Sequence, residues 1–212
     1  MAQHYLQTLI GPGAEALQTE AGSRESYARM ISGGNGLPDA LGDREAEFIA
    51  ARDSFYMASV TKDGWPYVQH RGGPAGFVKL IDDKTLAFPD FRGNRQYISL
   101  GNTNANDRVA LIMMDYPHRR RLKLYAHVEV RELADDPDLV EKLILPGYRA
   151  VPERAFLLHL DAFDWNCPQH ITPRFTESEI AAAVAPLQAR LNELEAQNHA
   201  LREKLAARKD PA

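Results

Sequence analysis

The chain has 212 residues, and 25 Lys and Arg stand against 29 Asp and Glu, giving a formal net charge of −4 at pH 7. This mildly acidic balance argues against bulk binding of nucleic acid, which needs a basic face. Hydrophobic residues make up 44% of the chain, which is enough for a packed core and excludes a disordered class.

The sequence also limits location and metal chemistry. No stretch approaches the roughly 18 apolar residues of a membrane span, and the start lacks the pattern of a secretory signal. We therefore expect no membrane association and a cytoplasmic location. Cys167 is the only cysteine, which excludes an intramolecular disulfide and an all-cysteine metal site, and we interpret it as structural. The seven histidines show no familiar metal-ligand spacing, so no metal is expected.

The first 41 residues carry scattered Gly and Pro around a short helical stretch near "SRESYARMI". They predict an extended N-terminal arm that lies on another part of the protein. The next segment, "DREAEFIAARDSF", places Ala46, Ile49 and Ala50 on one face. It predicts a helix, with Asp43 as its candidate N-cap.

From Phe55 onward the pattern changes to that of β-strands. Residues 55–71 predict a hairpin around an Asp-Gly turn, and residues 76–88 predict a second hairpin. Further strands are expected within 108–115, 121–133 and 154–163. A helix over 136–147 is expected to begin at an Asp-Pro pair and to end at a Pro-Gly pair. Six or more mostly antiparallel strands with short helices predict a mainly β, α+β fold, a closed or nearly closed barrel.

Residues 176–212 form a third region. Thr176 and Glu179 make a capping-box pattern at the start of a predicted helix. Its apolar residues follow a heptad with Leu at d and Asn198 at a, which is typical of a parallel two-stranded coiled coil. The alternative is a lone amphipathic helix folded onto its own barrel. Pro186 is expected to kink or restart the helix, because it removes a backbone donor.

Two segments have the composition of a ligand site. Arg92 and Arg95 bracket Gly93 and Asn94, and a short helix is predicted to start near Asn94 and to end near Gly101. Free backbone N–H groups at a helix start, with an arginine beside them, suit a phosphate; a turn with solvated arginines is the alternative. In residues 67–77, Gln-His-Arg precedes two glycines. Such a strand end suits the edge of a planar heterocycle, or is simply a hairpin corner.

Four stretches resemble the FMN-binding split-barrel flavoproteins related to pyridoxamine 5′-phosphate oxidase. They are "SVTKDGWPYVQHRGG", "TLAFPDFRGNRQYISLGN", "NDRVALIMMDYPHRRRLKLYAHVEV" and "FDWNCPQHITPRF", and the likeness covers residues 42–175. The resemblance implies a six-stranded antiparallel Greek-key split β-barrel that pairs as a homodimer, with each FMN between the subunits. The region before it is the 1–41 arm, and the C-terminal helix follows at 176–212.

The resemblance also implies where the cofactor binds. The most diagnostic element runs from Asp90 to Gln96, and in it Asn94 and Arg95 would hold the flavin phosphate. The ring edge would lie along a strand end, and three residues further along the chain would complete the pocket. The implied cofactor-binding residues are Gln69, His70, Arg71, Gly72, Gly73, Asp90, Asn94, Arg95, Gln96, Arg121, Trp165 and Gln169.

The activity implied is that of an FMN-dependent oxidoreductase of unassigned substrate, with a nicotinamide or another electron donor. The alternatives are a non-catalytic flavin-binding, sensing or electron-transfer module, and a haem- or deazaflavin-binding relative. No catalytic residue is singled out. The substrate-phosphate residues of true pyridoxamine 5′-phosphate oxidases have no counterpart beyond Lys79, and "QHITPR" replaces their Arg-x-His element. Pyridoxamine 5′-phosphate is therefore expected to be a poor substrate.

Overall fold

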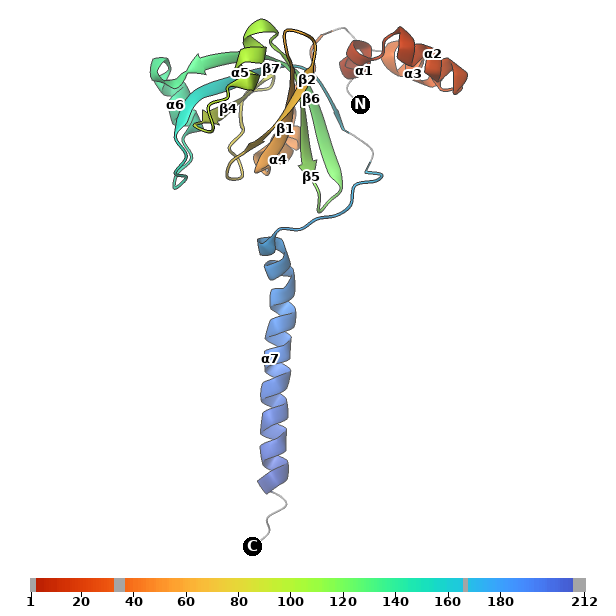
Figure 1. Ribbon diagram of the computed structural model, residues 1–212. Helices are drawn as coiled ribbons and strands as arrows, with labels where there is room; N and C mark the ends of the chain where they lie inside the picture. Colours follow the sequence, from red (N-terminus) through yellow and green to blue (C-terminus); the bar gives the residue numbers. More distant parts are fainter. Residues whose placement is uncertain (1–2, 33–36, 166–167, 208–212) are drawn as a thin grey trace. The chain divides into compact units, whose positions relative to one another are not determined.

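The computed structural model describes residues 3–32, 37–165 and 168–207. The chain divides into two compact units, Met1–Ile171 and Thr172–Ala212. The first unit is of mixed α and β structure and is built around one sheet (Figure 1). The second unit contains the long helix α7 (Glu177–Ala207).

Seven strands form the antiparallel sheet, in the order β2-β1-β5-β6-β7-β4-β3. The strands are β1 (Ser54–Val60), β2 (Pro66–Gly72), β3 (Lys79–Asp82), β4 (Thr85–Phe91), β5 (Arg108–Asp115), β6 (Arg120–Glu132) and β7 (Pro152–Trp165). The implied count of six is therefore wrong, because the short β3 pairs with β4 as a separate strand. The predicted hairpins β1–β2 and β3–β4 are both confirmed.

The sheet curls without closing into a barrel, so the closed form of the expected barrel is wrong. Within the described residues, no ladder joins the two edge strands β2 and β3. The curl is nevertheless strong, since the rings of Phe55 on β1 and Phe88 on β4 lie 5.1 Å apart between centroids. These strands are separated by β5, β6 and β7 in the sheet order. Only strong curvature brings their inner faces together.

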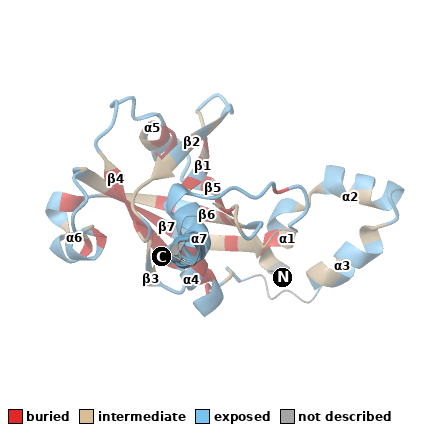
Figure 2. Cartoon of the chain, turned by 90° about the horizontal axis from the view of Figure 1, so that it is seen from below, coloured by how far each residue is buried: buried red, intermediate tan, exposed pale blue. Residues whose placement is uncertain are grey.

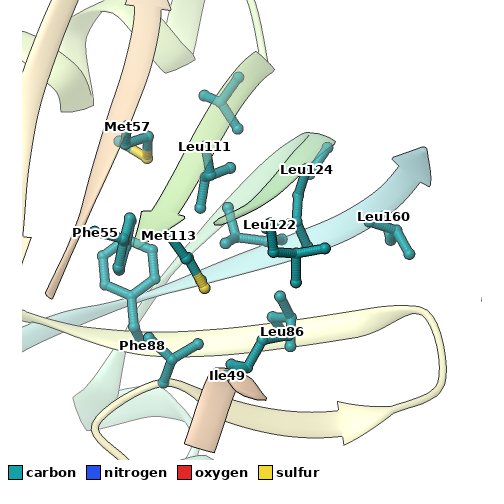
Figure 3. Close-up of a cluster of buried hydrophobic side chains, with 14 of the residues drawn as sticks. Ile49, Phe55, Met57, Leu86, Phe88, Leu111, Met113, Leu122, Leu124 and Leu160 are labelled. Atoms are coloured by element: carbon teal, nitrogen blue, oxygen red, sulfur yellow. The ribbon is translucent and has the colours of Figure 1, made fainter. Parts of the chain in front are cut away.

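The core lies inside this curl. Inward-pointing side chains of β1, β4, β5 and β6 meet Ile49 from helix α4 (Asp43–Ala50), as Figure 3 shows. The alternating burial along β5 and β6 explains the period of two in the sequence, because one sheet face is packed and the other is not. In Figure 2 many of the buried residues lie on the strands of the sheet. Every residue of α7 from Glu177 to Ala206 is exposed.

Helix α4 begins one residue earlier than the capping pattern indicates. Gly42 is its N-cap and Asp43 is already helical. The Gly42 backbone N–H donates a hydrogen bond of 3.1 Å to Glu45 Oε2, which satisfies one free donor at the helix start. The predicted helix at 136–147 is confirmed as α6 (Pro137–Leu143), where the Asp136 side chain accepts a hydrogen bond from the backbone N–H of Leu139. A short 3₁₀ turn, Leu133–Asp135, precedes it.

The N-terminal arm is helical, not extended. It contains α1 (Gln3–Leu9), α2 (Pro12–Glu20) and the predicted helix α3 (Arg24–Ser32). Tyr5 of α1 is buried, and its ring contacts that of Tyr125 on β6 at 5.5 Å between centroids. His4 Nε2 lies 3.1 Å from Asp161 Oδ1 on β7. Helix α1 of the arm therefore lies on the outer face of the sheet, whereas α3 contacts α1 and α2 contacts α3.

Helix α7 is continuous from Glu177 to Ala207, so the restart expected at Pro186 does not occur. A single lost backbone donor is tolerated within a helix of 31 residues. The predicted capping box is present. Glu179 Oε2 accepts a hydrogen bond of 2.7 Å from the Thr176 backbone N–H, and Thr176 Oγ1 accepts one from the Glu179 backbone N–H. Among the described residues, no helix is long and apolar enough to cross a membrane.

Candidate functional site

The candidate site is a depression at the place where the sheet fails to close. Strand β3 pairs only with the first part of β4, from Thr85 to Ala87. On the β3 side, the second half of β4 therefore has no neighbouring strand. It faces the end of β2 across a gap in the sheet, which we call the split. Helix α5 (Ile98–Ala105) and the loop before it complete the rim. The lining residues are Tyr67, Gln69, Arg71, Asp90, Phe91, Gly93, Asn94, Arg95, Gln96, Tyr97, Ile98, Ser99, Leu100 and Glu153.

An ion pair bridges the split. Arg71 Nη1 on β2 donates a hydrogen bond of 2.7 Å to Asp90 Oδ1 on β4, and both side chains are largely buried. The guanidinium also lies 5.1 Å from the ring centroid of Phe156, which stacks with Phe88. Arg71 Nε is buried and has no hydrogen-bond partner. The ion pair thus joins β2 to β4 and leaves one guanidinium donor unsatisfied.

Asp90 is shared by a second arginine from β7. Arg154 Nη1 lies 3.6 Å from Asp90 Oδ2, and Arg154 Nε donates a hydrogen bond of 2.8 Å to Glu132 Oε1. The Arg154 guanidinium also lies over the Tyr97 ring, 5.2 Å from its centroid. The sequence reasoning missed Arg154 and Tyr97. Arg154 faces Asp90 only through the register of β4 and β7, which pairs the two residues, so no local pattern marks it.

The loop from Arg92 to Tyr97 has an irregular backbone that faces the depression. Arg95 and Tyr97 have φ angles of 60° and 51°, a left-handed conformation that is uncommon for residues other than glycine. The Gln96 backbone N–H donates a hydrogen bond of 3.1 Å to Asn94 Oδ1, which fixes the turn. Helix α5 begins at Ile98 and ends at Ala105, so the expected helix start near Asn94 and end near Gly101 are wrong. Asn94 lies in the turn before the helix.

The two arginines of this loop have different surroundings. Arg92 Nε donates a hydrogen bond of 2.8 Å to Glu153 Oε1, and its backbone N–H donates to the Val151 carbonyl. The hydrogen bond from Arg92 holds the pKa of Glu153 below its ordinary value, so this carboxylate stays charged. Within the described residues, Arg95 forms no ion pair or hydrogen bond and lines the depression. Arg92 therefore anchors the loop, whereas Arg95 is available to an anion.

Hydrogen bonds hold α5 against the β1–β2 hairpin. The Ser99 hydroxyl donates to Gln69 Oε1 at 2.6 Å, and Asn102 Nδ2 donates to Ser59 Oγ on β1 at 3.0 Å. Ser99, Asn102 and Ser59 are all buried. These bonds fix the distance between β2 and the start of α5, and so the width of the depression on that side.

The structure brings together six of the twelve predicted cofactor residues, namely Gln69, Arg71, Asp90, Asn94, Arg95 and Gln96. His70 lies on the other face of β2, because side chains alternate along a strand, and its ring contacts that of Tyr56. Gly72 and Gly73 lie at the end of β2, beyond the depression. A Cβ on Gly73 would come within 2.8 Å of the Phe77 ring. The glycine therefore allows the backbone at this position to lie close to the Phe77 side chain.

The other three predicted residues lie away from the depression. Trp165, at the end of β7, packs edge-on against Phe48 of α4 and donates a hydrogen bond of 2.6 Å to Glu45 Oε1. Arg121 lies on the outer face of β6, where its charge acts on Tyr5 of the N-terminal arm. Gln169 is exposed in a turn, and the neighbouring Cys167 lies outside the described residues. In the part of the chain that the structure describes, no three His, Cys, Asp or Glu side chains are grouped to hold a metal ion.

A family model described as pyridoxamine 5′-phosphate oxidase matches residues 41–158, more than half of the chain. The chain belongs to the pyridoxamine 5′-phosphate oxidase family, as the sequence resemblance predicts. None of the curated protein sequences compared with the chain matches it.

Solved structures of related fold include three of interest. A protein from Lactobacillus delbrueckii, described as a candidate pyridoxamine 5′-phosphate oxidase, is 22% identical, with 59% of this chain and 93% of that chain covered and a TM-score of 0.45. An FMN-binding protein from Syntrophomonas wolfei is 11% identical, with coverages of 70% and 97% and a TM-score of 0.43. A protein of Clostridium acetobutylicum related to general stress protein 26 is 14% identical, with coverages of 65% and 94% and a TM-score of 0.44.

Proposed function

We propose that the protein is an FMN-binding flavoprotein that works as an oxidoreductase. The observation that carries the proposal is the exposed arginine in a left-handed turn at the split of the sheet. Arg95 forms no hydrogen bond or ion pair within the described residues, although its charge acts on the Glu153 carboxylate, and Asn94 and Gln96 stand beside it in the same depression. A doubly charged phosphate fits this donor set, because a guanidinium and amide donors bind its oxygens directly.

The neighbouring residues fit the rest of the cofactor. Arg71 has an unsatisfied buried donor beside the depression, which supports a role in binding a polar group of the flavin. Gln69 is fixed by Ser99 and would present its amide along the ring edge. Bound FMN supplies the hydride and electron chemistry itself. The chain's own residues would bind and orient the cofactor and keep the Arg71–Asp90 pair in place.

The proposed working unit is a homodimer with each flavin between two subunits. Arg121, Trp165 and Gln169 do not line the depression of their own chain. The sequence resemblance, which implies an FMN between the two subunits, is what supports a role for them toward the cofactor of a second copy. The donor of electrons would be a nicotinamide or another reductant from solution.

The visible spectrum of the purified protein, with and without added FMN, tests the proposal. Flavin bands and a preference for FMN over riboflavin are expected, since riboflavin lacks the phosphate. Equal affinity for the two ligands would remove the phosphate assignment, and a haem or deazaflavin spectrum would replace FMN as the ligand. Rapid bleaching of the flavin by NADH or NADPH would support the oxidoreductase, whereas tight FMN without turnover would leave a binding module.

Replacement of Arg95 by Ala is expected to weaken FMN binding by about 1.5–3 kcal/mol, the range of a hydrogen bond to a charged group. Riboflavin binding should change little, because the lost contact is to the phosphate. The measurement is titration calorimetry of both ligands with both proteins. Arg29→Ala, on the exposed face of α3, is the matched control. Unchanged FMN affinity in Arg95→Ala would contradict the assignment.

Pyridoxamine 5′-phosphate is expected to be a poor substrate of the flavin-loaded protein. The reason lies in the sequence, where the helix and C-terminal segment lack the residues that read the substrate phosphate in true oxidases. The measurement is hydrogen peroxide release with pyridoxamine 5′-phosphate under air, with the flavin-free protein as control. A rate comparable to that of a dedicated oxidase would contradict the expectation.

A further inference from the structure

Helix α7 carries an apolar face that no described residue of its own unit, Thr172–Ala212, covers. Every described residue from Thr172 to Ala206 is exposed. The large apolar side chains of this helix are between 45% and 71% exposed, and Leu187 is the most exposed of them. They are Ile180, Val184, Leu187, Leu191, Leu194, Leu201 and Leu205. A monomeric helix with this face would leave a long apolar strip in water.

We propose that α7 pairs with α7 of a second copy of this chain in a parallel, in-register, two-stranded coiled coil. The apolar residues recur at alternating steps of three and four, from Ile180 to Leu205. At 1.5 Å per residue this seam is about 40 Å long, and it spans more than three heptads, the length that distinguishes a coiled coil from a short amphipathic helix. This pairing goes beyond the flavin site and does not depend on it.

Asn198 selects the direction and the register of the pair. It occupies an a position between Leu194 and Leu201, the one polar residue in the seam. In a parallel, in-register pair, the two Asn198 side chains meet and can hydrogen-bond to each other. In an antiparallel pair with the same seam buried, Asn198 would face Leu187 of the other copy. A buried amide without a partner is costly, so the parallel arrangement is favoured.

The flanking charges agree with this arrangement. In a parallel pair, the residue at g faces the residue at e in the next heptad of the other helix. Arg190 then faces Glu195 on both sides of the pair, and Gln197 faces Arg202. Pro186 falls at a c position, away from the seam, where its missing N–H does not disturb the packed face.

Disulfide trapping in the full-length chain tests the pairing. In a Cys167→Ser background, Leu191→Cys places the only thiol at an a position, and Ala196→Cys places it at the outer f position. Paired a positions bring the two Cα atoms within disulfide range. We expect Leu191→Cys to form the linked dimer at least about tenfold faster than Ala196→Cys under mild oxidation. Similar rates at both positions would overturn the proposal.

Two more variants separate the remaining arrangements. In an equal mixture of Val184→Cys and Leu201→Cys chains, which both keep Asn198, an antiparallel pair gives mainly the mixed linked dimer, which would overturn the parallel assignment. Two further chains combine Leu191→Cys with a second substitution. Leu194→Asp, at a d position, is expected to abolish disulfide formation through Leu191→Cys. Ala196→Asp, at the outer f position, is expected to leave it unchanged. Trapping that survives Leu194→Asp would also overturn the proposal. FMN binding is measured on each variant, and its loss or retention bears only on the flavin site.

Discussion

The sheet unit and helix α7 use the same kind of sequence signal in opposite ways. Both have a regular apolar period, of two along β5 and β6 and of three to four along α7. In the sheet unit, the apolar side chains are covered by other parts of the same chain, and Phe55, Met57, Phe88 and Met113 have no exposed surface. In α7, the apolar face is not covered by any described residue of its own unit.

This difference separates folding from assembly. The sheet unit gains its stability from burial within one chain, because its curl brings distant strands together. An isolated helix gains little from its backbone alone, so most helix stability in proteins comes from packing of an apolar face. A periodic apolar pattern therefore predicts burial, but it does not say whether the covering surface belongs to the same chain or to another.

The largest effect is expected in the core of the sheet unit. Phe88 is fully buried and packs against Phe55 and Phe156. Phe88→Ala should lower the free energy of unfolding by about 3–5 kcal/mol, the cost of a large cavity in a packed core. Urea unfolding followed by fluorescence measures it. Leu17→Ala on the exposed face of α2 is the control and should change stability by less than about 0.5 kcal/mol. Equal effects of the two changes would contradict the described core.

A smaller effect is expected at Asp115, at the end of β5. Its side chain is only 3% exposed and accepts hydrogen bonds from the backbone N–H and ring of His118, with Arg52 3.8 Å away. Burial alone would raise the pKa of Asp115, but these hydrogen bonds and the Arg52 charge outweigh it and hold the pKa below its ordinary value. The ionised form is therefore the one that the fold stabilises.

A carboxyl group with a lowered folded-state pKa contributes stability above its unfolded pKa of about 3.9, and this contribution is lost as the pH falls through the folded value. Asp115→Asn should cost about 1.5–3 kcal/mol at pH 7 and should make the decline in stability below pH 4 shallower. Unfolding curves between pH 2 and pH 7 measure both effects. The control is Asp135→Asn at an exposed position, which should leave the pH dependence of stability as in the parent protein. If the acid profile of Asp115→Asn were also the same as that of the parent protein, the result would count against the lowered pKa of Asp115.

The smallest effect is expected at the start of α7. Thr176→Ala removes the side chain of the capping box and should lower the stability of this helix by about 0.5–2 kcal/mol. The sheet unit should be unaffected, since Thr176 and Glu179 bond to each other. Amide hydrogen exchange in the first turns of α7 reports the change, and Thr172→Ala outside the helix is the control. Slower exchange in Thr176→Ala than in the control would be incompatible with the cap.

The family and most secondary structure were predictable because they depend on local signals. Both hairpins, the helix that begins after Asp136, and the Thr176 cap follow from patterns of a few residues. The two hairpins and three further strands expected from the sequence pattern already make seven strands. The expectation of six strands came only from the family resemblance. Six residues expected to bind the cofactor share one depression, because they belong to the end of β4 with the turn that follows it and to one face of β2.

The remaining features depend on contacts between distant residues. Arg154 reaches Asp90 only because β7 pairs with β4 in one register. Helix α5 starts at Ile98 and not near Asn94, because Arg95 and Tyr97 adopt left-handed conformations that interrupt a helix. No residue type in "RGNRQY" requires these conformations. The N-terminal arm is helical and held on the sheet by Tyr5 and His4, through side chains more than a hundred residues away in sequence. The sequence alone thus determined the family, both hairpins, α6 and the cap of α7, since these depend on composition and short-range spacing. Only the tertiary structure decided where the sheet stays open, because closure depends on whether β2 and β3, at the two ends of the strand order, can form a ladder.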